Sequence, residues 1–290
     1  HHRPFARPAS PSGGTCRLVT RLMAWFLTAP RCRCTIRYPV KRCHNFGVSR
    51  YPCQQILAAS PPSDKEGILA AYALLEDGRA VLLHLALGPR ESTDAWVAFL
   101  NDLPTRGLGE PLLILLDGSP GLAKAVRQVF PSVRRQRCQV HKMRNILAKL
   151  PRLAQRELKP LIQQVFLAPD HRTALCRGRA LLARFRERFP SAMECLEKDL
   201  EECLTALLFP VGHRKRIRTT NLLERTFEES RRRTKVIPRF PGERARLALV
   251  FATLITAAEQ WRGVRMTPKI LRALDALRTE AAPRHEQSAA

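Results

Sequence analysis

The sequence predicts an α/β fold in which helices cover a mixed β-sheet and an all-helical segment is inserted before the last helices. Three observations lead to this prediction. Two apolar runs within residues 68–87 flank an Asp-Gly turn, which is the pattern of a β-hairpin. A strand, a helix and a second strand are predicted over residues 112–140, and parallel strands need such a crossover. Residues 142–212 show helical periodicity and no strand pattern.

Residues 1–63 differ in composition from the rest of the chain. They contain no Asp or Glu, and Asp64 is the first acidic residue. They show neither helical nor strand periodicity over a useful length and are rich in Pro, Arg and Cys. We therefore expect a disordered segment or an out-of-frame start of a truncated gene, with a basic DNA-binding arm as the alternative.

The ordered part is expected to begin with the hairpin. Ile68–Leu75 and Ala80–Leu87 are its strands, and Asp77 between them is interpreted as a turn residue rather than a catalyst. Ser92 then suits the N-cap of a helix. The apolar face of that helix has helical spacing and consists of Trp96, Phe99, Leu100 and Leu103.

Residues 112–116 form an unbroken apolar run, short enough for a fully buried strand. The run ends at Asp117, after which Gly118, Ser119 and Pro120 favour a tight turn and the start of a helix over residues 120–130. A second strand is expected over residues 133–140, with His141 at its end. Ligands gather at the carboxyl ends of strands in open α/β sheets, so Asp117 is a candidate site residue.

Helices are predicted for most of the remaining chain. In the segment 142–212, Asp170 suits the N-cap of one helix, and Ser191 with Glu194 forms a capping-box pattern for another. The first helix of the segment is expected to pack through Met143, Ile146, Leu147 and Leu150. The last long helix, 243–261, shows an apolar face made of Leu247, Phe251, Leu254, Ala258 and Trp261. These patterns divide the chain into residues 1–63, a sheet part at 64–141, the helical segment at 142–212, a further part at 213–265 and a tail at 266–290.

Basic residues dominate the charge of the chain. The formal net charge is +25, with 50 Lys and Arg residues, so nucleic acid is the leading partner and a merely basic or ribosome-associated protein is the alternative. The densest basic cluster surrounds Glu224 and is a candidate DNA-binding surface. It comprises Arg214, Lys215, Arg216, Arg218, Arg225, Arg231, Arg232, Arg233 and Lys235.

Asp117 and Glu224 are the carboxylates most suited to hold divalent metal ions for phosphoryl transfer. Each has an alternative interpretation. Asp117 could serve only the Asp-Gly turn, and Glu224 could serve only a capping box that begins at Asn221. Taken singly, each alternative is at least as good as catalysis. The basic cluster around Glu224 favours a role near a phosphate backbone.

Cys138 and His141 form a Cys-x-x-His pair. The spacing suits zinc, but a structural zinc site needs four ligands, and only one pair is present. His141 could instead orient a carboxylate, contact a phosphate or be a core histidine. The cysteines show no disulfide framework, and no stretch reaches transmembrane length, so a soluble, cytoplasmic protein is expected.

Two longer blocks of sequence carry a family resemblance. The first reads Leu-Asp117-Gly-x-x-Gly-Leu and continues to Gln-Arg-Cys138-x-x-His141-x-x-Arg-Asn. The second reads Arg-Thr-Thr-Asn221-Leu-Leu-Glu224-Arg and continues to Arg-Arg-Arg-Thr-Lys-Val-Ile-Pro-Arg-Phe-Pro. Their sequence and order, over about residues 65–265, resemble the bacterial mutator-type insertion-sequence transposases.

The resemblance implies an RNase H-like mixed sheet with helices on both faces and a helical insertion before the last catalytic helix. It also implies DNA strand cleavage and transfer by an Asp-Asp-Glu triad with Mg²⁺ or Mn²⁺. Asp117 matches the second Asp, Glu224 the Glu, and Cys138, His141 and Asn221 the surrounding motifs. The implied partners are insertion-element ends, target DNA and further copies of the chain in a homodimer or higher assembly, with no membrane and no small-molecule substrate.

One part of the family pattern is missing. The first Asp of the triad should lie on a strand just before the hairpin, but no acidic residue precedes Asp64, which is expected in a loop. We therefore expect a truncated and catalytically impaired transposase. The alternative is a non-catalytic basic DNA-binding protein that inhibits a full-length transposase.

Overall fold

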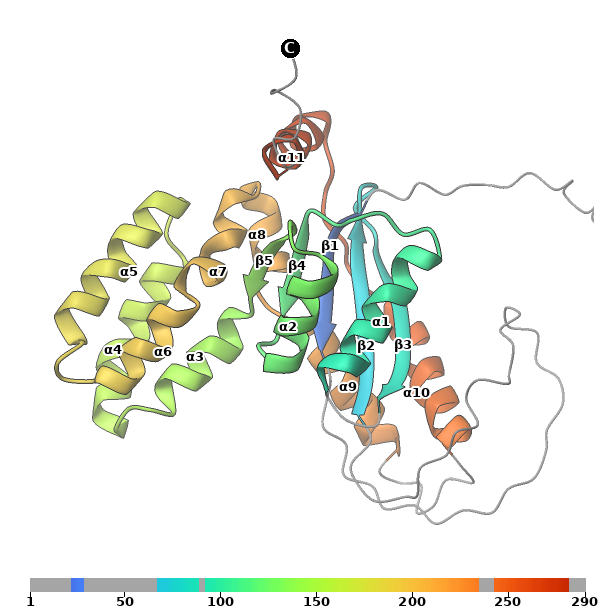
Figure 1. Ribbon diagram of the computed structural model, residues 1–290, viewed down its shortest axis with the longest axis horizontal. Coiled ribbons are helices and arrows are strands. Elements are labelled where there is room, and N and C mark those ends of the chain that lie inside the picture. The colour runs from blue at the N-terminus through green and yellow to red at the C-terminus, as the bar shows by residue number, and fades with distance from the viewer. Residues whose placement is uncertain (1–21, 29–66, 89–91, 235–242, 282–290) are drawn as a thin grey trace, which may run out of the picture.

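The computed structural model describes residues 22–28, 67–88, 92–234 and 243–281, and its centre is a five-stranded mixed sheet (Figure 1). The strand order is β3-β2-β1-β4-β5. The antiparallel part comprises β1 (Leu22–Thr28), β2 (Gly67–Leu75) and β3 (Ala80–Gly88). The parallel part adds β4 (Leu113–Leu116) beside β1 and β5 (Arg134–Arg137) beside β4. The prediction of a mixed α/β fold is confirmed.

The middle strand, β1, was not predicted. The expectation that residues 1–63 lack regular structure is wrong for Leu22–Thr28, which pairs with β2 on one side and β4 on the other. A strand inside a sheet that is covered on both faces needs no alternation of apolar and polar residues. The short apolar run therefore carries no periodic signal. The other residues of 1–63 lie outside the described part of the chain.

The hairpin and the first helix follow their sequence patterns. Gly78 has φ +89° in the turn, and the Asp77 carboxylate accepts a hydrogen bond from the backbone N–H of Arg79, at 2.8 Å. Asp77 is therefore a turn residue, as predicted. Helix α1 (Thr93–Thr105) begins after Ser92, whose hydroxyl oxygen accepts its capping hydrogen bond at 3.2 Å. Its buried residues are the four predicted ones, Trp96, Phe99, Leu100 and Leu103.

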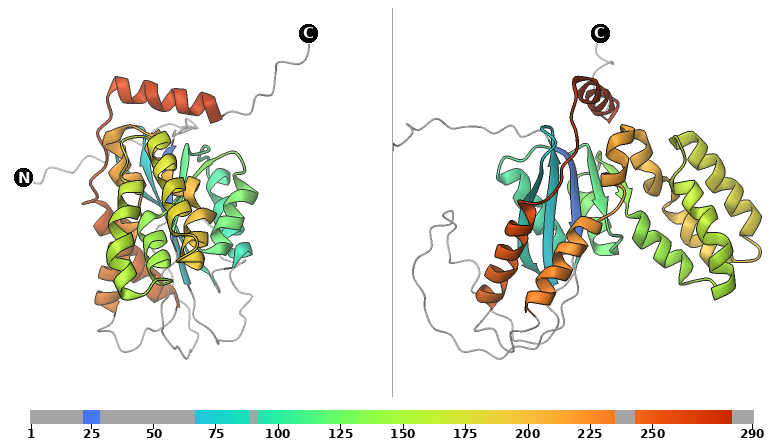
Figure 2. Two further views of the ribbon diagram at one scale, coloured as in Figure 1. Left: turned by 90° about the vertical axis from the view of Figure 1, so that its left-hand side faces the viewer. Right: turned by 180° about the vertical axis from the view of Figure 1, so that it is seen from behind.

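Helices cover both faces of the sheet (Figures 1 and 2). One face packs against α1 and α2 (Pro120–Val129), and the opposite face packs against α9 (Asn221–Thr234) and α10 (Glu243–Ala258). Helix α11 (Pro268–Ala281) lies across one end of the sheet (Figures 1 and 2) and adds Leu274 to the core of the α9 side. Alternate residues of β4 separate the two cores: Ile114 and Leu116 face α1 and α2, whereas Leu113 and Leu115 face the α9 side.

Strand β5 is shorter than the predicted strand over residues 133–140. It ends at Arg137, Cys138 takes the N-cap position, and α3 runs over Gln139–Leu147. Cys138 and Val140 continue the alternation of a strand in sequence, but the chain turns into a helix there. The prediction that His141 ends a strand is therefore wrong, since His141 lies in the first turn of α3.

A helical bundle with its own core stands beside the β5 edge of the sheet (Figure 1). After α3 it comprises α4 (Arg152–Phe166), α5 (His171–Phe185), α6 (Pro190–Lys198), α7 (Leu200–Leu204), a 3₁₀ turn (Thr205–Leu208) and α8 (Val211–Ile217). The predicted Asp170 cap is confirmed by a hydrogen bond from the Thr173 N–H at 2.8 Å. The capping box at Ser191 is wrong, because the N-cap of α6 is Phe189 and the helix starts at Pro190, two residues earlier than predicted.

Helix α10 presents a different face to the core from the predicted one. Val250 and Leu254 are buried, whereas Phe251 is 40% exposed. The helix packs against α9 and the edge strand β3, so its contact face is rotated by about one residue from the purely apolar stripe. Among the described residues, no helix combines the length and the apolar character that a membrane crossing requires.

Candidate active site

Asp117 follows the last residue of β4, in a turn that its neighbours hold in place. Gly118 has φ +95°, and a Cβ there would overlap the guanidinium of Arg137. The Arg137 guanidinium also donates to the backbone carbonyl of Asp117. One oxygen of the Asp117 carboxylate accepts the N–H of Ser119 at 2.9 Å, so Asp117 does serve the turn. Because Leu113 and Leu115 face the α9 side, alternation directs the Asp117 side chain to that side too.

Glu224 lies in the first turn of α9 and is surrounded by side chains of other segments. Its Oε1 accepts a hydrogen bond from the Thr220 hydroxyl at 2.7 Å and lies 3.6 Å from Nε2 of His141. Its Oε2 lies 3.8 Å from Arg144. In the capping-box alternative, the Glu224 carboxylate would bond to the backbone N–H of Asn221 as N-cap. It would then not use Thr220, His141 or Arg144. Asn221 is the first residue of α9.

His141 connects the two carboxylates electrostatically. Its pKa is raised above the usual value, first by a hydrogen bond with Cys138 and then, against the opposing effect of burial, by the negative charges of Cys138, Glu224 and Asp117. Asp117 and Glu224 are far apart in sequence, yet both act on the same imidazole. Leu115 of β4 and Leu223 of α9 belong to the same core, so both carboxylates lie toward this side of the sheet.

Cys138 is fully buried where β5 passes into α3. Its Sγ accepts a hydrogen bond from the backbone N–H of Thr220 at 3.4 Å, and the Thr220 hydroxyl, whose proton is donated to Glu224, lies 3.4 Å from the same sulfur. Burial alone would raise the pKa of the Cys138 thiol, but hydrogen bonds from His141 and Thr220 hold it below the usual value. Donor atoms of Cys138, His141 and Glu224 all lie within 4.8 Å of one another. From the sequence, Cys138 and His141 were only a Cys-x-x-His pair.

The strand next to Asp117 offers no third carboxylate. β1 and β4 are parallel with Leu27 opposite Leu116, so continuing the register places Thr28 beside Asp117. β1 reads LMAWFLT and contains neither Asp nor Glu. Strand β1 therefore brings no carboxylate to the Asp117 end of β4.

A buried ionic network behind the site was not predicted. Asp199 accepts a hydrogen bond from Lys142 Nζ at 2.8 Å and lies 3.7 Å from Nε of Arg137. The Lys142 side chain is only 2% exposed. Since Arg137 packs on Gly118, this network connects the helical bundle to the Asp117 turn. Sequence pattern cannot distinguish a buried Lys from the many exposed ones of so basic a chain.

The described residues of the predicted basic cluster lie on α8, on α9 and in the turn between them, and their side chains have different partners. Arg214 donates to the backbone carbonyl of Phe209 at 2.9 Å, so it supports the backbone. Hydrogen bonds from Arg232 and Arg233 lower the pKa of Glu229 to about 2. Lys215, Arg225, Arg231, Arg232 and Arg233 are exposed, and Arg216 and Arg218 are partly exposed. Lys235 lies outside the described residues.

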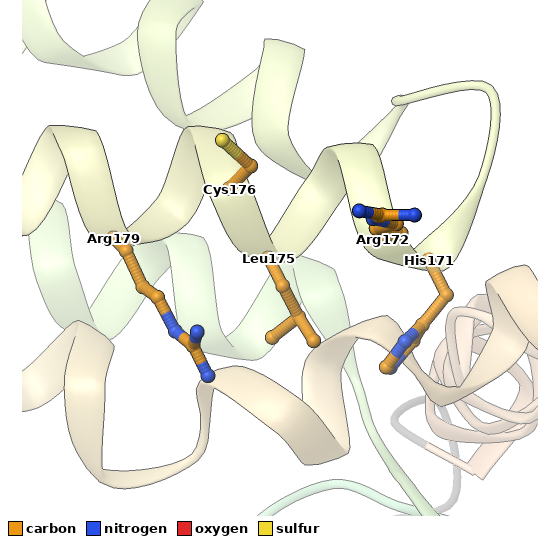
Figure 3. Close-up of a pocket in the computed structure, with 5 residues that line it drawn as sticks. All are labelled: His171, Arg172, Leu175, Cys176 and Arg179. Carbon is orange, nitrogen blue, oxygen red and sulfur yellow. The ribbon is translucent and has the colours of Figure 1, made fainter.

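A separate surface pocket lies along α5 in the helical bundle (Figure 3). It is lined by His171, Arg172, Leu175, Cys176 and Arg179. None of these five residues belongs to the group around Asp117 and Glu224, so we do not assign the pocket to the candidate site.

Comparison with known proteins identifies related sequences. Residues 62–263 match the family model described as transposase, Mutator family. The transposase for insertion sequence element IS6120 of Mycolicibacterium smegmatis is 37% identical over 202 residues, 69% of this chain and 62% of that protein. The transposase for element IST2 of Acidithiobacillus ferrooxidans is 34% identical, over 70% of this chain and 69% of that protein. The transposase for element ISRM5 of Rhizobium meliloti is 35% identical, over 68% of this chain and 49% of that protein. The matched part thus spans from about half to about two thirds of these relatives.

Proposed function

Because the chain belongs to the Mutator family of transposases, we propose that it binds DNA and carries two carboxylates, Asp117 and Glu224, of a site for DNA strand cleavage and transfer. The observation that carries this proposal is the position of the two carboxylates toward one side of the sheet, where the negative charge of each contributes to the raised pKa of His141. Asp117 follows the end of a central strand, and Glu224 lies in the first turn of a helix that packs on the same side of the sheet.

An RNase H-like fold is part of the proposal. The strand order β3-β2-β1-β4-β5, with an antiparallel part, a parallel part and helices on both faces, supports it. The bundle α3–α8 lies in sequence between Asp117 and Glu224, which agrees with a helical insertion before the last catalytic helix.

Mg²⁺ or Mn²⁺ is the proposed cofactor, held by Asp117 and Glu224. Carboxylate oxygens are the ligands that these hard cations prefer, so the donor set fits. When bound, such ions activate the attacking oxygen and stabilise the leaving one. The chain itself orients the carboxylates: the Ser119 N–H holds Asp117, and the Thr220 hydroxyl holds Glu224. Arg144 beside Glu224 can contact a DNA phosphate.

Catalysis is proposed to be impaired, because β1 supplies Thr28 rather than a carboxylate beside Asp117. This observation also favours a second function, in which the chain binds DNA without cleaving it and inhibits a full-length transposase by joining its assembly. In both cases the exposed basic residues of α8 and α9 contact DNA phosphates at element ends and target, and copies of the chain form a homodimer or a higher assembly.

The test separates the two functions. Purified protein is incubated with DNA carrying the ends of its insertion element, with Mg²⁺ or Mn²⁺, and nicked products are measured. Nicking that disappears in both Asp117→Ala and Glu224→Ala would establish the catalytic role of this pair. Salt-sensitive DNA binding without nicking would leave only the inhibitory function, and absence of both would overturn the proposal.

A further inference from the structure

We infer that Cys138, His141 and Glu224 form a binding site for one soft divalent transition-metal ion, with Zn²⁺ the best fit. The inference rests on geometry. The thiol, the imidazole and the carboxylate come from two segments, the start of α3 and the start of α9, yet their donor atoms lie within 4.8 Å of one another. Nothing in the proposed cleavage chemistry requires a thiol at this position.

The donor set selects the class of metal. Mg²⁺ and Ca²⁺ take oxygen ligands, whereas a thiolate with an imidazole favours zinc and similar ions. Zinc sites with three protein ligands and one open position are common, and they use Cys, His and carboxylate ligands. Two ligands about 2.0–2.1 Å from a tetrahedral zinc ion are about 3.3 Å apart. The observed 3.6 Å between His141 Nε2 and Glu224 Oε1 is close to that separation.

Hydrogen bonds from Thr220 orient two of the three proposed ligands. The Thr220 backbone N–H donates to the Cys138 sulfur, and the Thr220 hydroxyl donates to the Glu224 carboxylate. Hydrogen bonds of this kind orient metal ligands and stabilise a thiolate. Cys138 is buried, but the side chains of His141 and Glu224 are 26% and 23% exposed, so an ion can enter from their side.

Binding has a consequence that rests on the proposed function. Glu224 would be shared between the soft-metal site and the proposed Mg²⁺ site, so a zinc ion on Cys138, His141 and Glu224 withdraws Glu224 from Asp117.

Metal binding is tested on the full chain without DNA, by titration with Co²⁺ as a spectroscopic substitute for Zn²⁺. The thiolate-to-cobalt absorption band reports the Cys138 ligand. Because the chain has eight other cysteines, the measured quantity is the difference between the wild type and Cys138→Ser. We expect this difference band to saturate at one ion per chain and to disappear on addition of Zn²⁺. His141→Ala should abolish it, and Glu224→Gln should weaken binding by about tenfold or more.

Cys176→Ser is the matched control, because Cys176 is an exposed thiol on α5, outside the cluster, and it should leave the band unchanged. If Cys138→Ser does not fold, the comparison rests on His141→Ala and Glu224→Gln, which alter partly exposed side chains. Equal cobalt spectra for the wild type and these variants would overturn the inference, and so would unchanged affinity in Glu224→Gln. The cobalt measurement contains no DNA, so its result does not depend on whether the chain cleaves DNA. If cobalt does not bind, the metal-site inference fails, and the proposed function is unaffected.

Discussion

Asp117 is positioned largely by its own neighbours in the chain, whereas Glu224 is held both by Thr220, four residues before it, and by side chains of the distant helix α3. The Asp117 turn depends on Gly118 and on the N–H of Ser119, with Arg137 packed from the adjacent strand. Glu224 meets Thr220 from the preceding residues but also His141 from α3. The turn is therefore specified locally, and the surroundings of Glu224 exist only when the bundle and α9 have both folded. Substitutions on the two sides should differ accordingly.

The largest effect is expected from Asp199→Ala, which removes the carboxylate behind the Asp117 turn. Lys142 would keep a buried charge without its 2.8 Å partner, and Arg137 would lose its ion pair. Breaking a buried pair in this way costs about 3–5 kcal/mol, and we expect about 3 kcal/mol because Asp199 is 25% exposed. Urea denaturation measures the loss.

Two further variants test the cause of that loss. Glu157→Ala breaks an exposed ion pair with Arg188 in the same bundle and should cost less than about 0.5 kcal/mol. Lys142→Met in the Asp199→Ala background removes the unpaired charge and should restore much of the stability. If the double variant stays as unstable as Asp199→Ala, the buried charge is not the cause.

Gly118→Ala should have the next largest effect, again on the Asp117 side. The residue would be strained at φ +95°, and its Cβ would displace the Arg137 guanidinium, so we expect a loss of about 2–3 kcal/mol in the free energy of unfolding. Gly107→Ala is the matched control. Gly107 has φ +85°, but an added Cβ there meets no described atom within 4 Å, so only about 1 kcal/mol should be lost. Equal losses in the two variants would show that Arg137 adds nothing to the turn.

On the Glu224 side, Thr220→Val should cost about 1 kcal/mol. It removes the 2.7 Å hydrogen bond to Glu224, and the partly exposed carboxylate can recover water as a partner. A double-mutant cycle with Glu224→Gln should show a coupling of at least about 0.5 kcal/mol. Thr226→Val is the control, since the Thr226 hydroxyl donates to the backbone carbonyl of Leu222 and should not couple to Glu224. Absence of coupling at Thr220 would mean that this hydroxyl does not hold Glu224.

Features that depend on local sequence could be predicted, whereas features that depend on contacts between distant segments could not. The strand over residues 112–116, the hairpin and the α1 core follow from local patterns, and the structure agrees with them. β1 was missed because a short apolar run between two other strands carries no periodicity. Phe251 was predicted to lie in the core because it continues a row of apolar residues at helical spacing. The packing of α10 on α9 and β3 decides which face of the helix is buried, and Phe251 lies outside that face.

In the candidate site, too, the sequence predicted individual residues but not the contacts between segments. Asp117 could be located as a residue at a strand end, and Glu224 as an acid at a helix start. The contact of Thr220 with Cys138 and the Lys142–Asp199 pair could not be located, because each depends on the docking of segments that are distant in sequence. Periodicity describes one element at a time, so it carries no information about which polar side chains two elements bring together.

The smallest effect is expected from Ser119→Ala, within about 0.5 kcal/mol of the wild type. Ser119 occupies the N-cap position of α2, but among the described residues its hydroxyl makes no capping hydrogen bond; its backbone N–H, which alanine retains, donates to Asp117. Ser92→Ala is the control, because the Ser92 hydroxyl does cap α1, and its loss should cost about 1 kcal/mol. Chemical denaturation of both variants distinguishes two ways of holding the turn. If Ser119→Ala costs as much as Ser92→Ala, the hydroxyl supports the Asp117 turn; if it costs almost nothing, the turn depends on the Asp117 carboxylate, Gly118 and Arg137.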